Sequence, residues 1–122
     1  MSDLDLTGRR ILLVEDEYLI ARSLGELLGI WGATVLGPAS TIERALGLLA
    51  KTDGIDFALV DINLRGVAAF PVADALLARG IPFAFTTGYG TSMIPEHYRD
   101  VAALQKPFDA AVLAKALLIL TS

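Results

Sequence analysis

Five segments of the chain have the hydrophobic pattern of strands. The mostly apolar runs are Ile11–Val14, Phe57–Val60, Ile81–Thr87 and Val101–Leu104, and a shorter run is Thr34–Leu36, which the Gly37-Pro38 pair is expected to end. Runs without polar alternation are typical of strands covered on both faces, as in parallel sheets. The sequence therefore predicts a buried parallel sheet.

Segments with apolar residues three to four apart alternate with these runs. They predict helices over Tyr18–Trp31, Ile42–Lys51, Pro71–Arg79 and Asp109–Leu120, the last capped by Asp109. The stretch from Thr91 to Asp100 has too few periodic apolar positions and is expected to be irregular, with at most a short helix. Alternating strands and helices with right-handed crossovers give an α/β sheet with helices on both faces.

Length and composition restrict the function. The 122 residues suit a single domain over 1–122, with its core over about 9–121, and 54% of them are hydrophobic. A formal net charge of −4 argues against direct nucleic-acid or membrane binding, because both need basic surfaces. No stretch has the length of a membrane span. The absence of cysteine and of a targeting segment favours a cytoplasmic protein.

Polar residues follow the predicted strands at the edge where open parallel sheets place their functional groups. The residues at these strand ends are Glu15, Asp16, Asp61, Asn63, Thr87 and Lys106. Carboxylates that meet at one edge repel one another unless a hard cation such as Mg²⁺ joins them. A strand-end carboxylate can also attack phosphorus while a lysine and a hydroxyl neutralise the phosphoryl oxygens. Asp61, Lys106 and Thr87 suit these three roles.

Four motifs in this order resemble those of one family. ILLVEDE, ALVDIN, FAFTTGYG and LQKPF are similar to the motifs of the CheY-like receiver domains of two-component response regulators, over essentially the whole chain. FAFTTGYG further resembles the Phe-Ala-Thr-Gly-x-Tyr-like signature of stand-alone alphaproteobacterial receivers. The resemblance implies a flavodoxin-like, doubly wound five-stranded sheet of order 2-1-3-4-5. It also implies a phosphorylation-dependent signalling module rather than an enzyme.

The resemblance also implies a role for each strand-end residue. Asp61 would be the phosphoacceptor, Asp16 a direct Mg²⁺ ligand, Glu15 a metal-site acid acting through water, Asn63 a ligand through its backbone carbonyl, Thr87 the switch hydroxyl and Lys106 the phosphate-contacting lysine. The phosphoryl donor would be a histidine kinase or a phosphotransfer protein, and the output a switched protein-interaction surface.

Some positions depart from the family pattern. Ala103 stands where many receivers carry a switch aromatic, and Leu64-Arg65-Gly66 replaces the familiar Met-Pro. Tyr89 lies two residues beyond Thr87, as Asn63 lies two beyond Asp61, and the resemblance implies that the side chains at both positions flank the acyl phosphate. Tyr89 is expected to shield that phosphate from water.

Other interpretations remain open. Asp61 could be the nucleophile of a Mg²⁺-dependent phosphohydrolase, although the chain lacks a second acid two residues on and a substrate cap. A flavin-binding module is disfavoured because Glu15-Asp16-Glu17 would repel a phosphate. The chain could instead be a receiver fragment of a hybrid kinase or a longer regulator. The apolar stripe of the last helix (Val112, Leu113, Ala116, Leu117 and Leu120) is expected to be core, or in part a docking or homodimer face.

Overall fold

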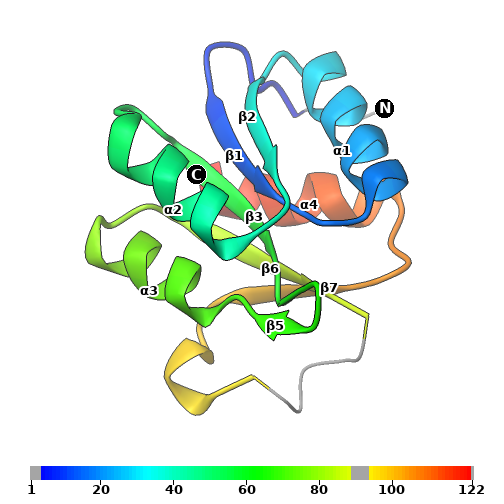
Figure 1. Ribbon diagram of the computed structural model, residues 1–122. Helices are drawn as coiled ribbons and strands as arrows, with labels where there is room; N and C mark the ends of the chain where they lie inside the picture. The colour runs from blue at the N-terminus through cyan, green and yellow to red at the C-terminus, as the bar shows by residue number, and fades with distance from the viewer. Residues whose placement is uncertain (1–3, 89–93, 122) are drawn as a thin grey trace.

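Five parallel strands form the central sheet of the protein. The computed structural model describes residues 4–88 and 94–121 (Figure 1). The strand order is β2-β1-β3-β6-β7, and every neighbouring pair is parallel. The elements are β1 Arg10–Val14, α1 Tyr18–Ile30, β2 Thr34–Ala39, α2 Ile42–Lys51, β3 Phe57–Asp61, β4 Asn63–Leu64, β5 Val67–Ala68, α3 Phe70–Ala78, β6 Phe83–Thr87, the 3-10 turn η1 Glu96–Tyr98, β7 Ala102–Gln105 and α4 Ala110–Thr121.

The helices lie on both faces of this sheet. α1 and α4 cover one face, and α2 and α3 cover the other (Figure 1). Because β6 and β7 are the fourth and fifth strands of the main sheet, the predicted order 2-1-3-4-5 is confirmed. The doubly wound arrangement places the carboxyl ends of β1, β3 and β6 at one edge, where the predicted site lies.

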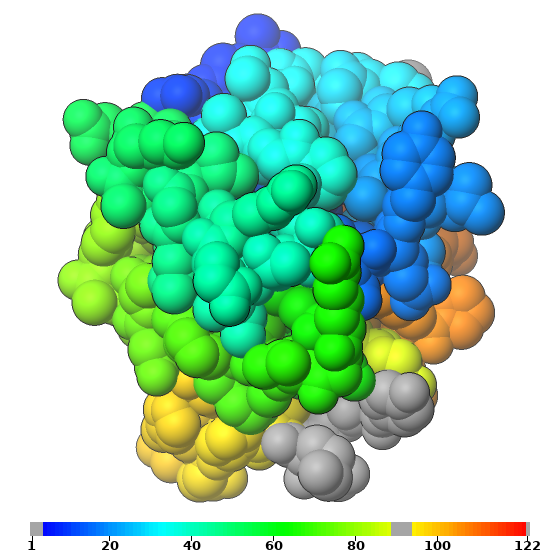
Figure 2. Space-filling view, viewed as in Figure 1, coloured from blue at the N-terminus to red at the C-terminus, as the bar shows by residue number. Residues whose placement is uncertain are grey.

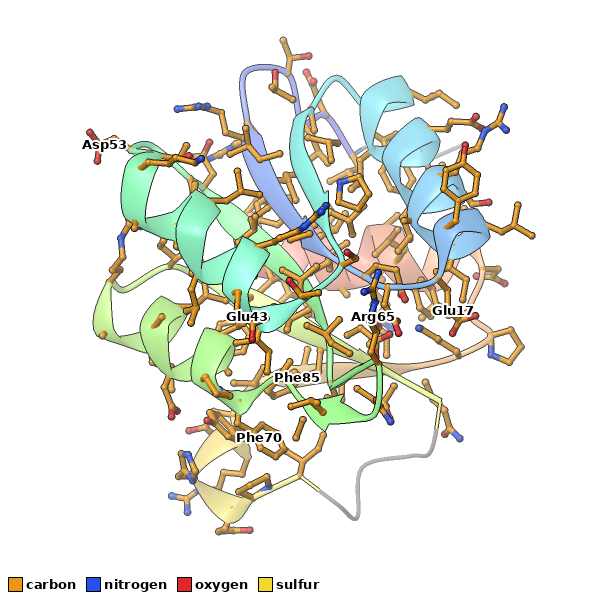
Figure 3. The ribbon with its side chains drawn as sticks, viewed as in Figure 1. Glu17, Glu43, Asp53, Arg65, Phe70 and Phe85 are labelled. Carbon is orange, nitrogen blue, oxygen red and sulfur yellow. The ribbon has the colours of Figure 1, made fainter. Side chains whose placement is uncertain are left out.

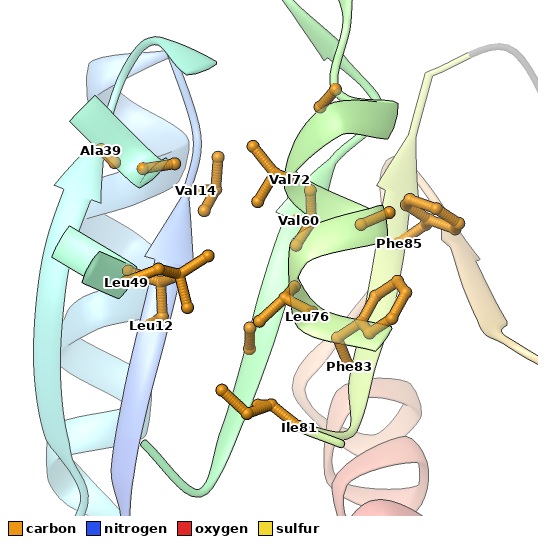
Figure 4. Packing of buried hydrophobic residues seen from close by; sticks show 14 of the residues in the cluster. Leu12, Val14, Ala39, Leu49, Val60, Val72, Leu76, Ile81, Phe83 and Phe85 are labelled. Carbon is orange, nitrogen blue, oxygen red and sulfur yellow. The ribbon is translucent and has the colours of Figure 1, made fainter. Parts of the chain in front are cut away.

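Side-chain alternation along the strands explains why their sequences are apolar throughout. In β1, Leu12 and Val14 belong to the cluster under α2 and α3, whereas Ile11 and Leu13 belong to the cluster under α1 and α4. Figure 4 shows the first of these clusters, with Leu12, Val14 and Val60 directed toward the helices. Both faces of a central strand are therefore dry, as its sequence predicts.

The expectation that Gly37-Pro38 ends the second strand is wrong. β2 continues to Ala39, and its pairing with β1 is irregular between Leu12 and Val14. Gly37 has φ 102° and a Cβ there would lie 2.6 Å from the carbonyl oxygen of Leu13, so glycine is required. An edge strand can also accommodate a proline, which lacks a backbone N–H.

The connection between β6 and β7 is irregular, as predicted. Its described part, residue 88 and residues 94–101, contains only the turn η1. The sequence pattern nevertheless missed one core residue in it, since Tyr98 is only 1% exposed and packs in the cluster under α2 and α3. The regular βα alternation is therefore interrupted here in the described residues.

The ends of the chain pack differently from expectation. Leu4 and Leu6 are buried in the cluster under α1 and α4, so the core begins before residue 9. In α4, Leu113 and Leu117 are buried as predicted, but Val112 is 47% exposed and is not a core residue. Within the described residues, no helix is long and apolar enough to cross a membrane.

Local capping fixes where two helices begin. The hydroxyl of Thr41 accepts a hydrogen bond from the Arg44 N–H at 3.1 Å at the start of α2. The Asp109 carboxylate accepts one from the Val112 N–H at 2.9 Å and so caps α4, as the sequence predicts.

Candidate functional site

Four carboxylates meet at the carboxyl edge of the sheet. Glu15, Asp16 and Glu17 follow β1, and Asp61 is the last residue of β3. One oxygen of each lies within 4.8 Å of the others. A pocket of about 350 Å³ opens at this place, and it is lined by Asp16, Glu17, Asp61, Asn63, Gly88 and Lys106. The strand ends therefore converge as the sequence predicts.

Lys106 lies close to three of the four acids. Its Nζ lies 2.9 Å from Asp61 Oδ2, 2.8 Å from Glu15 Oε1 and 3.8 Å from Glu17 Oε1. Its backbone N–H donates to the Thr87 carbonyl at 2.7 Å, which fixes the residue directly after β7. Burial alone would lower the pKa of Lys106, but hydrogen bonds to Glu15 and Asp61 outweigh burial and raise it. The lysine is therefore a permanent ammonium at neutral pH.

Glu15 is a deeply buried acid whose charged form is disfavoured by its surroundings. It is 2% exposed, and burial raises its pKa to about 7, with Lys106 opposing the shift and Asp61 adding to it. Its Oε2 accepts a hydrogen bond from the Glu17 N–H at 3.1 Å. Its Oε1 is buried and has no aligned hydrogen-bond donor in the described part of the chain, despite its proximity to the ammonium. This oxygen can accept a further cationic partner.

Asp61 is held on both of its oxygens. The side chain is almost fully buried, Oδ2 accepts from Lys106, and Oδ1 accepts from the Asn63 N–H at 3.0 Å. The Asn63 side chain does not reach back toward it, because its Oδ1 accepts from the Gly66 N–H at 2.7 Å. These contacts fix the orientation of the Asp61 carboxylate at the bottom of the pocket.

Asp16 also lines the pocket. It is half-buried, and its Oδ2 accepts a hydrogen bond from the Arg65 N–H at 2.9 Å. Arg65 belongs to the short hairpin β4–β5, whose surface lies beside the start of α1 (Figure 2). In Figure 3 the Arg65 side chain extends from this hairpin, with Glu17 to its side.

The predicted switch hydroxyl lies at the end of β6. Thr87 is 4% exposed and directly precedes Gly88, which lines the pocket. Tyr89 lies outside the described residues. Ala103 is partly buried against the cluster under α2 and α3, where Tyr98 supplies a large aromatic side chain.

The donors at this edge fit a hard divalent cation. Four carboxylates supply oxygen ligands of the kind that Mg²⁺ prefers, and Glu15 Oε1 is a buried oxygen without an aligned donor among the described residues. The chain has no cysteine, and its one histidine, His97, lies beside Asp74 at a Nε2–Oδ1 distance of 3.9 Å, apart from the acids. A soft or imidazole-ligated transition metal therefore does not suit the site.

The residue pattern predicted most of this site but not all of it. Glu15, Asp16, Asp61 and Lys106 were expected to converge, and they lie in contact or on neighbouring walls of the pocket. Glu17 was not among the predicted site residues, yet it lines the pocket. Arg65 was given no role, because a backbone hydrogen bond to Asp16 leaves no signal in residue type.

The sequence of the chain is similar to that of a known regulatory protein. No family model matches the chain. The transcriptional regulatory protein PdtaR of Mycobacterium tuberculosis is 29% identical over 113 residues, which are 89% of this chain and 55% of that protein. The chain thus spans about half the length of the curated relatives that it matches.

Solved structures cover nearly the whole of both chains, and two of them are more similar in sequence than PdtaR. SdrG of Sphingomonas melonis Fr1 is 43% identical with a TM-score of 0.82, and the match covers 93% of this chain and 97% of that chain. The BeF3-activated conformation of SdrG, from Pseudomonas melonis Fr1, is 44% identical over 93% of this chain and 96% of that one, with a TM-score of 0.79. The non-phosphorylated HemR receiver domain of Leptospira biflexa is 25% identical over 94% of this chain and 95% of that one, with a TM-score of 0.82.

Proposed function

The chain belongs to the receiver domains of two-component response regulators, and on this basis we propose that Asp61 is its phosphoacceptor. The observation that carries this assignment is the contact of Asp61 with Lys106 at 2.9 Å inside a cluster of four carboxylates. A buried strand-end carboxylate, one ammonium and a set of oxygen ligands are the groups that phosphoryl transfer requires.

In this proposal the other residues hold the metal and the phosphoryl group. Asp16 and Asp61 would bind Mg²⁺ directly, Glu15 would act through a water molecule, and Asn63 would contribute its backbone carbonyl. Bound Mg²⁺ supplies positive charge that offsets the carboxylates and the transferring phosphoryl oxygens.

The transfer step then follows from the contacts of Asp61. A carboxylate oxygen of Asp61 attacks the phosphorus of a phosphohistidine whose other ring nitrogen already carries a proton. The P–N bond breaks, and the imidazole leaves as a neutral ring that keeps the bonding electron pair. Lys106 exchanges its contact with Asp61 for a phosphoryl oxygen, and the Thr87 hydroxyl donates to another. No further acid is needed, because the leaving group is an imidazole.

The physiological setting is part of the same proposal. The donor is a histidine kinase or a phosphotransfer protein, and phosphorylation changes the affinity of a protein-binding surface for a downstream protein. The protein acts in the cytoplasm without binding nucleic acid or membrane itself. The chain functions as a stand-alone regulator, a homodimer or the receiver part of a longer protein. Tyr89 shields the acyl phosphate, so that Tyr89→Ala shortens the phosphoryl lifetime.

Phosphorylation by a small donor tests the proposal. The protein is incubated with Mg²⁺ and acetyl phosphate, and intact mass is recorded for wild type, Asp61→Asn and the exposed control Asp53→Asn. We expect one added phosphoryl group in wild type and Asp53→Asn and none in Asp61→Asn. Equal labelling of Asp61→Asn, or no labelling of wild type, would refute the assignment. Steady hydrolysis of varied phosphomonoesters would favour the phosphohydrolase instead.

A further inference from the structure

The segment that follows β3 is a tight hairpin in an unusual backbone conformation. β4 and β5 pair antiparallel, with Asn63 opposite Ala68 and Leu64 opposite Val67, so that Arg65 and Gly66 form the turn. Both turn residues have positive φ, 53° for Arg65 and 82° for Gly66. Glycine and asparagine favour this region, whereas arginine adopts it at a cost. Non-glycine residues in this conformation persist where the surrounding structure requires them.

The turn connects the two carboxylates assigned as direct metal ligands. At one end of the hairpin, the Asn63 N–H donates to Asp61 Oδ1 at 3.0 Å. At the tip, the Arg65 N–H donates to Asp16 Oδ2 at 2.9 Å, although the two residues are 49 positions apart in sequence. A single hairpin therefore orients an acid from β3 and an acid from the β1–α1 connection.

Other contacts keep the hairpin in place. The Gly66 N–H donates to Asn63 Oδ1 at 2.7 Å across the turn, and the Ala69 N–H donates to the Ile62 carbonyl at 2.6 Å at its base. Leu64 is 2% exposed and belongs to the cluster under α2 and α3. The hairpin is thus anchored to the core through Leu64 and to the chain on either side through its base.

The Arg65 side chain is not the group that contacts Asp16. It is exposed, and its guanidinium is directed to the Ser40 hydroxyl at 3.5 Å. The contact with Asp16 comes from the backbone N–H, whose direction depends on the positive-φ turn. Substitutions that alter the turn should therefore matter more than substitutions that alter the Arg65 side chain.

We propose that the β4–β5 hairpin is a positioning element of the metal site, and that the turn Arg65-Gly66 orients the Asp16 carboxylate toward the cation through the Arg65 N–H. The proposal rests on the proposed function insofar as that function assigns Asp16 as a Mg²⁺ ligand. Groups that orient metal ligands without touching the metal typically contribute a factor of about 10 to 100 in affinity.

A matched pair of glycine substitutions tests this role. Gly66 and Gly8 both have φ 82°, and a Cβ added to either residue would meet no atom within 4 Å, so Gly66→Val and Gly8→Val introduce the same backbone strain without a clash at Cβ. Gly8 lies in the turn before β1, at the opposite end of that strand from the acids. The Mg²⁺ dissociation constant is measured by titration for both variants, together with the amide resonance of Arg65.

We expect Gly66→Val to weaken Mg²⁺ binding about tenfold and to shift the Arg65 amide resonance toward that of a free N–H. Gly8→Val should stay within about twofold of wild type at a similar loss of stability, and Gly66→Asn, which tolerates positive φ, should restore binding. Arg65→Gly keeps the N–H and the turn and should also bind Mg²⁺ normally. If a valine variant fails to fold, Gly66→Ala and Gly8→Ala form the milder pair.

Equal Mg²⁺ affinities in the Gly66 and Gly8 variants would overturn the positioning role, whatever the outcome for phosphorylation. If wild type is not phosphorylated on Asp61 but Gly66→Val still weakens Mg²⁺ binding, the proposed function is refuted and the positioning role stands. The two failures are therefore distinguishable.

Discussion

The acidic pocket and the aromatic cluster beside α3 both bury polar groups, but the groups are paired differently. The aromatic cluster consists of Phe70, Phe83, Phe85 and Tyr98. In the pocket, Glu15 is buried with one oxygen lacking an aligned donor among the described residues, and its pKa is raised to about 7. In the cluster, Tyr98 is equally buried, but its phenol donates to the Asp74 carboxylate and also approaches the Phe70 carbonyl at 3.4 Å. In the pocket, Glu15 shares the Lys106 ammonium with Asp61, whereas in the cluster the phenol has its own hydrogen-bond partner.

The aromatic cluster owes its stability to ring packing. Tyr98 stacks on Phe70 at 5.3 Å between ring centroids and meets the edge of Phe85 at 5.5 Å, and Phe83 meets Phe85 at 5.4 Å. Phe70 and Phe85 lie close together between α3 and β6 (Figure 3). Such pairs add to the free energy gained by burying the rings.

The difference shows where the fold is stabilised and where it is not. Burying a paired phenol and several rings favours folding, whereas gathering carboxylates in a half-closed pocket opposes it until a cation arrives. Changes in the cluster should therefore destabilise the protein. Neutralisation or metal binding in the pocket should stabilise it.

Among the substitutions considered, Phe85→Ala should cause the largest change in the free energy of unfolding, because it removes the central ring of the aromatic cluster. Phe85 is fully buried and contacts three other rings, so its removal leaves a cavity and should lower the free energy of unfolding by about 3–5 kcal/mol. Urea denaturation measures the change. Val67→Ala, at a position 56% exposed, is the control and should change stability by less than about 0.5 kcal/mol. Similar losses in both variants would contradict the assignment of the cluster as the stabilising region.

Glu15→Gln should raise the free energy of unfolding, whereas Phe85→Ala lowers it. The folded-state pKa of Glu15, about 7, exceeds its ordinary value of 4.5, so folding favours the protonated acid and the stability of the wild type falls as pH rises from 4.5 through 7. The variant lacks this loss and should be more stable than wild type at pH 8, by up to about 3 kcal/mol without Mg²⁺.

The advantage of Glu15→Gln should disappear below about pH 4.5, where Glu15 is protonated in both the folded and the unfolded state. Thermal denaturation across this pH range measures it, and the exposed Glu43→Gln serves as the control. A destabilised Glu15→Gln protein at pH 8 would show that the pocket stabilises the fold after all.

Tyr98→Phe tests the internal hydrogen bond of the cluster. Removing a phenol that donates to a carboxylate should cost about 2 kcal/mol near neutral pH. Burial, with Asp74 adding to it, raises the pKa of Tyr98 from 10.0 to about 12. The contribution is therefore complete below pH 10 and is lost between pH 10 and 12, where the two proteins should converge in stability. A difference that stays constant across this range would argue that the hydroxyl is not responsible.

Mg²⁺ should stabilise the protein by binding in the acidic pocket, so changes in the aromatic cluster should not alter the gain. At ten times its dissociation constant, the ion should add about 1.4 kcal/mol to the stability of wild type and of Tyr98→Phe. Asp16→Asn and Asp61→Asn should gain much less. Differential scanning calorimetry measures the shift, and an equal gain in all four proteins would place the ion elsewhere.

The predictable parts of the structure are those in which residue type alone carries the signal. Uniformly apolar runs identified the strands, and acids and a lysine at their ends identified the site, because parallel topology brings these ends together. The capping role of Asp109 was visible for the same reason, since short polar side chains suit helix starts.

Other features depend on backbone geometry or on distant partners. The continuation of β2 through Gly37 depends on a pairing irregularity with β1, and the hairpin tip at Arg65 depends on a hydrogen bond to Asp16. Tyr98 lies in a segment without helical periodicity, so its burial against Phe70 and Phe85 had no local signal. Long-range contacts of this kind determine what sequence pattern alone leaves out.

The most direct measurement of the central claim is the position of the phosphoryl group. After phosphorylation by acetyl phosphate with Mg²⁺, borohydride reduces an aspartyl phosphate to homoserine, and peptide mass spectrometry then locates the converted residue. We predict conversion at Asp61 and at no other aspartate. Conversion at Asp16 or elsewhere, or no conversion in protein that has gained a phosphoryl group, would contradict the assignment of Asp61 as the phosphoacceptor.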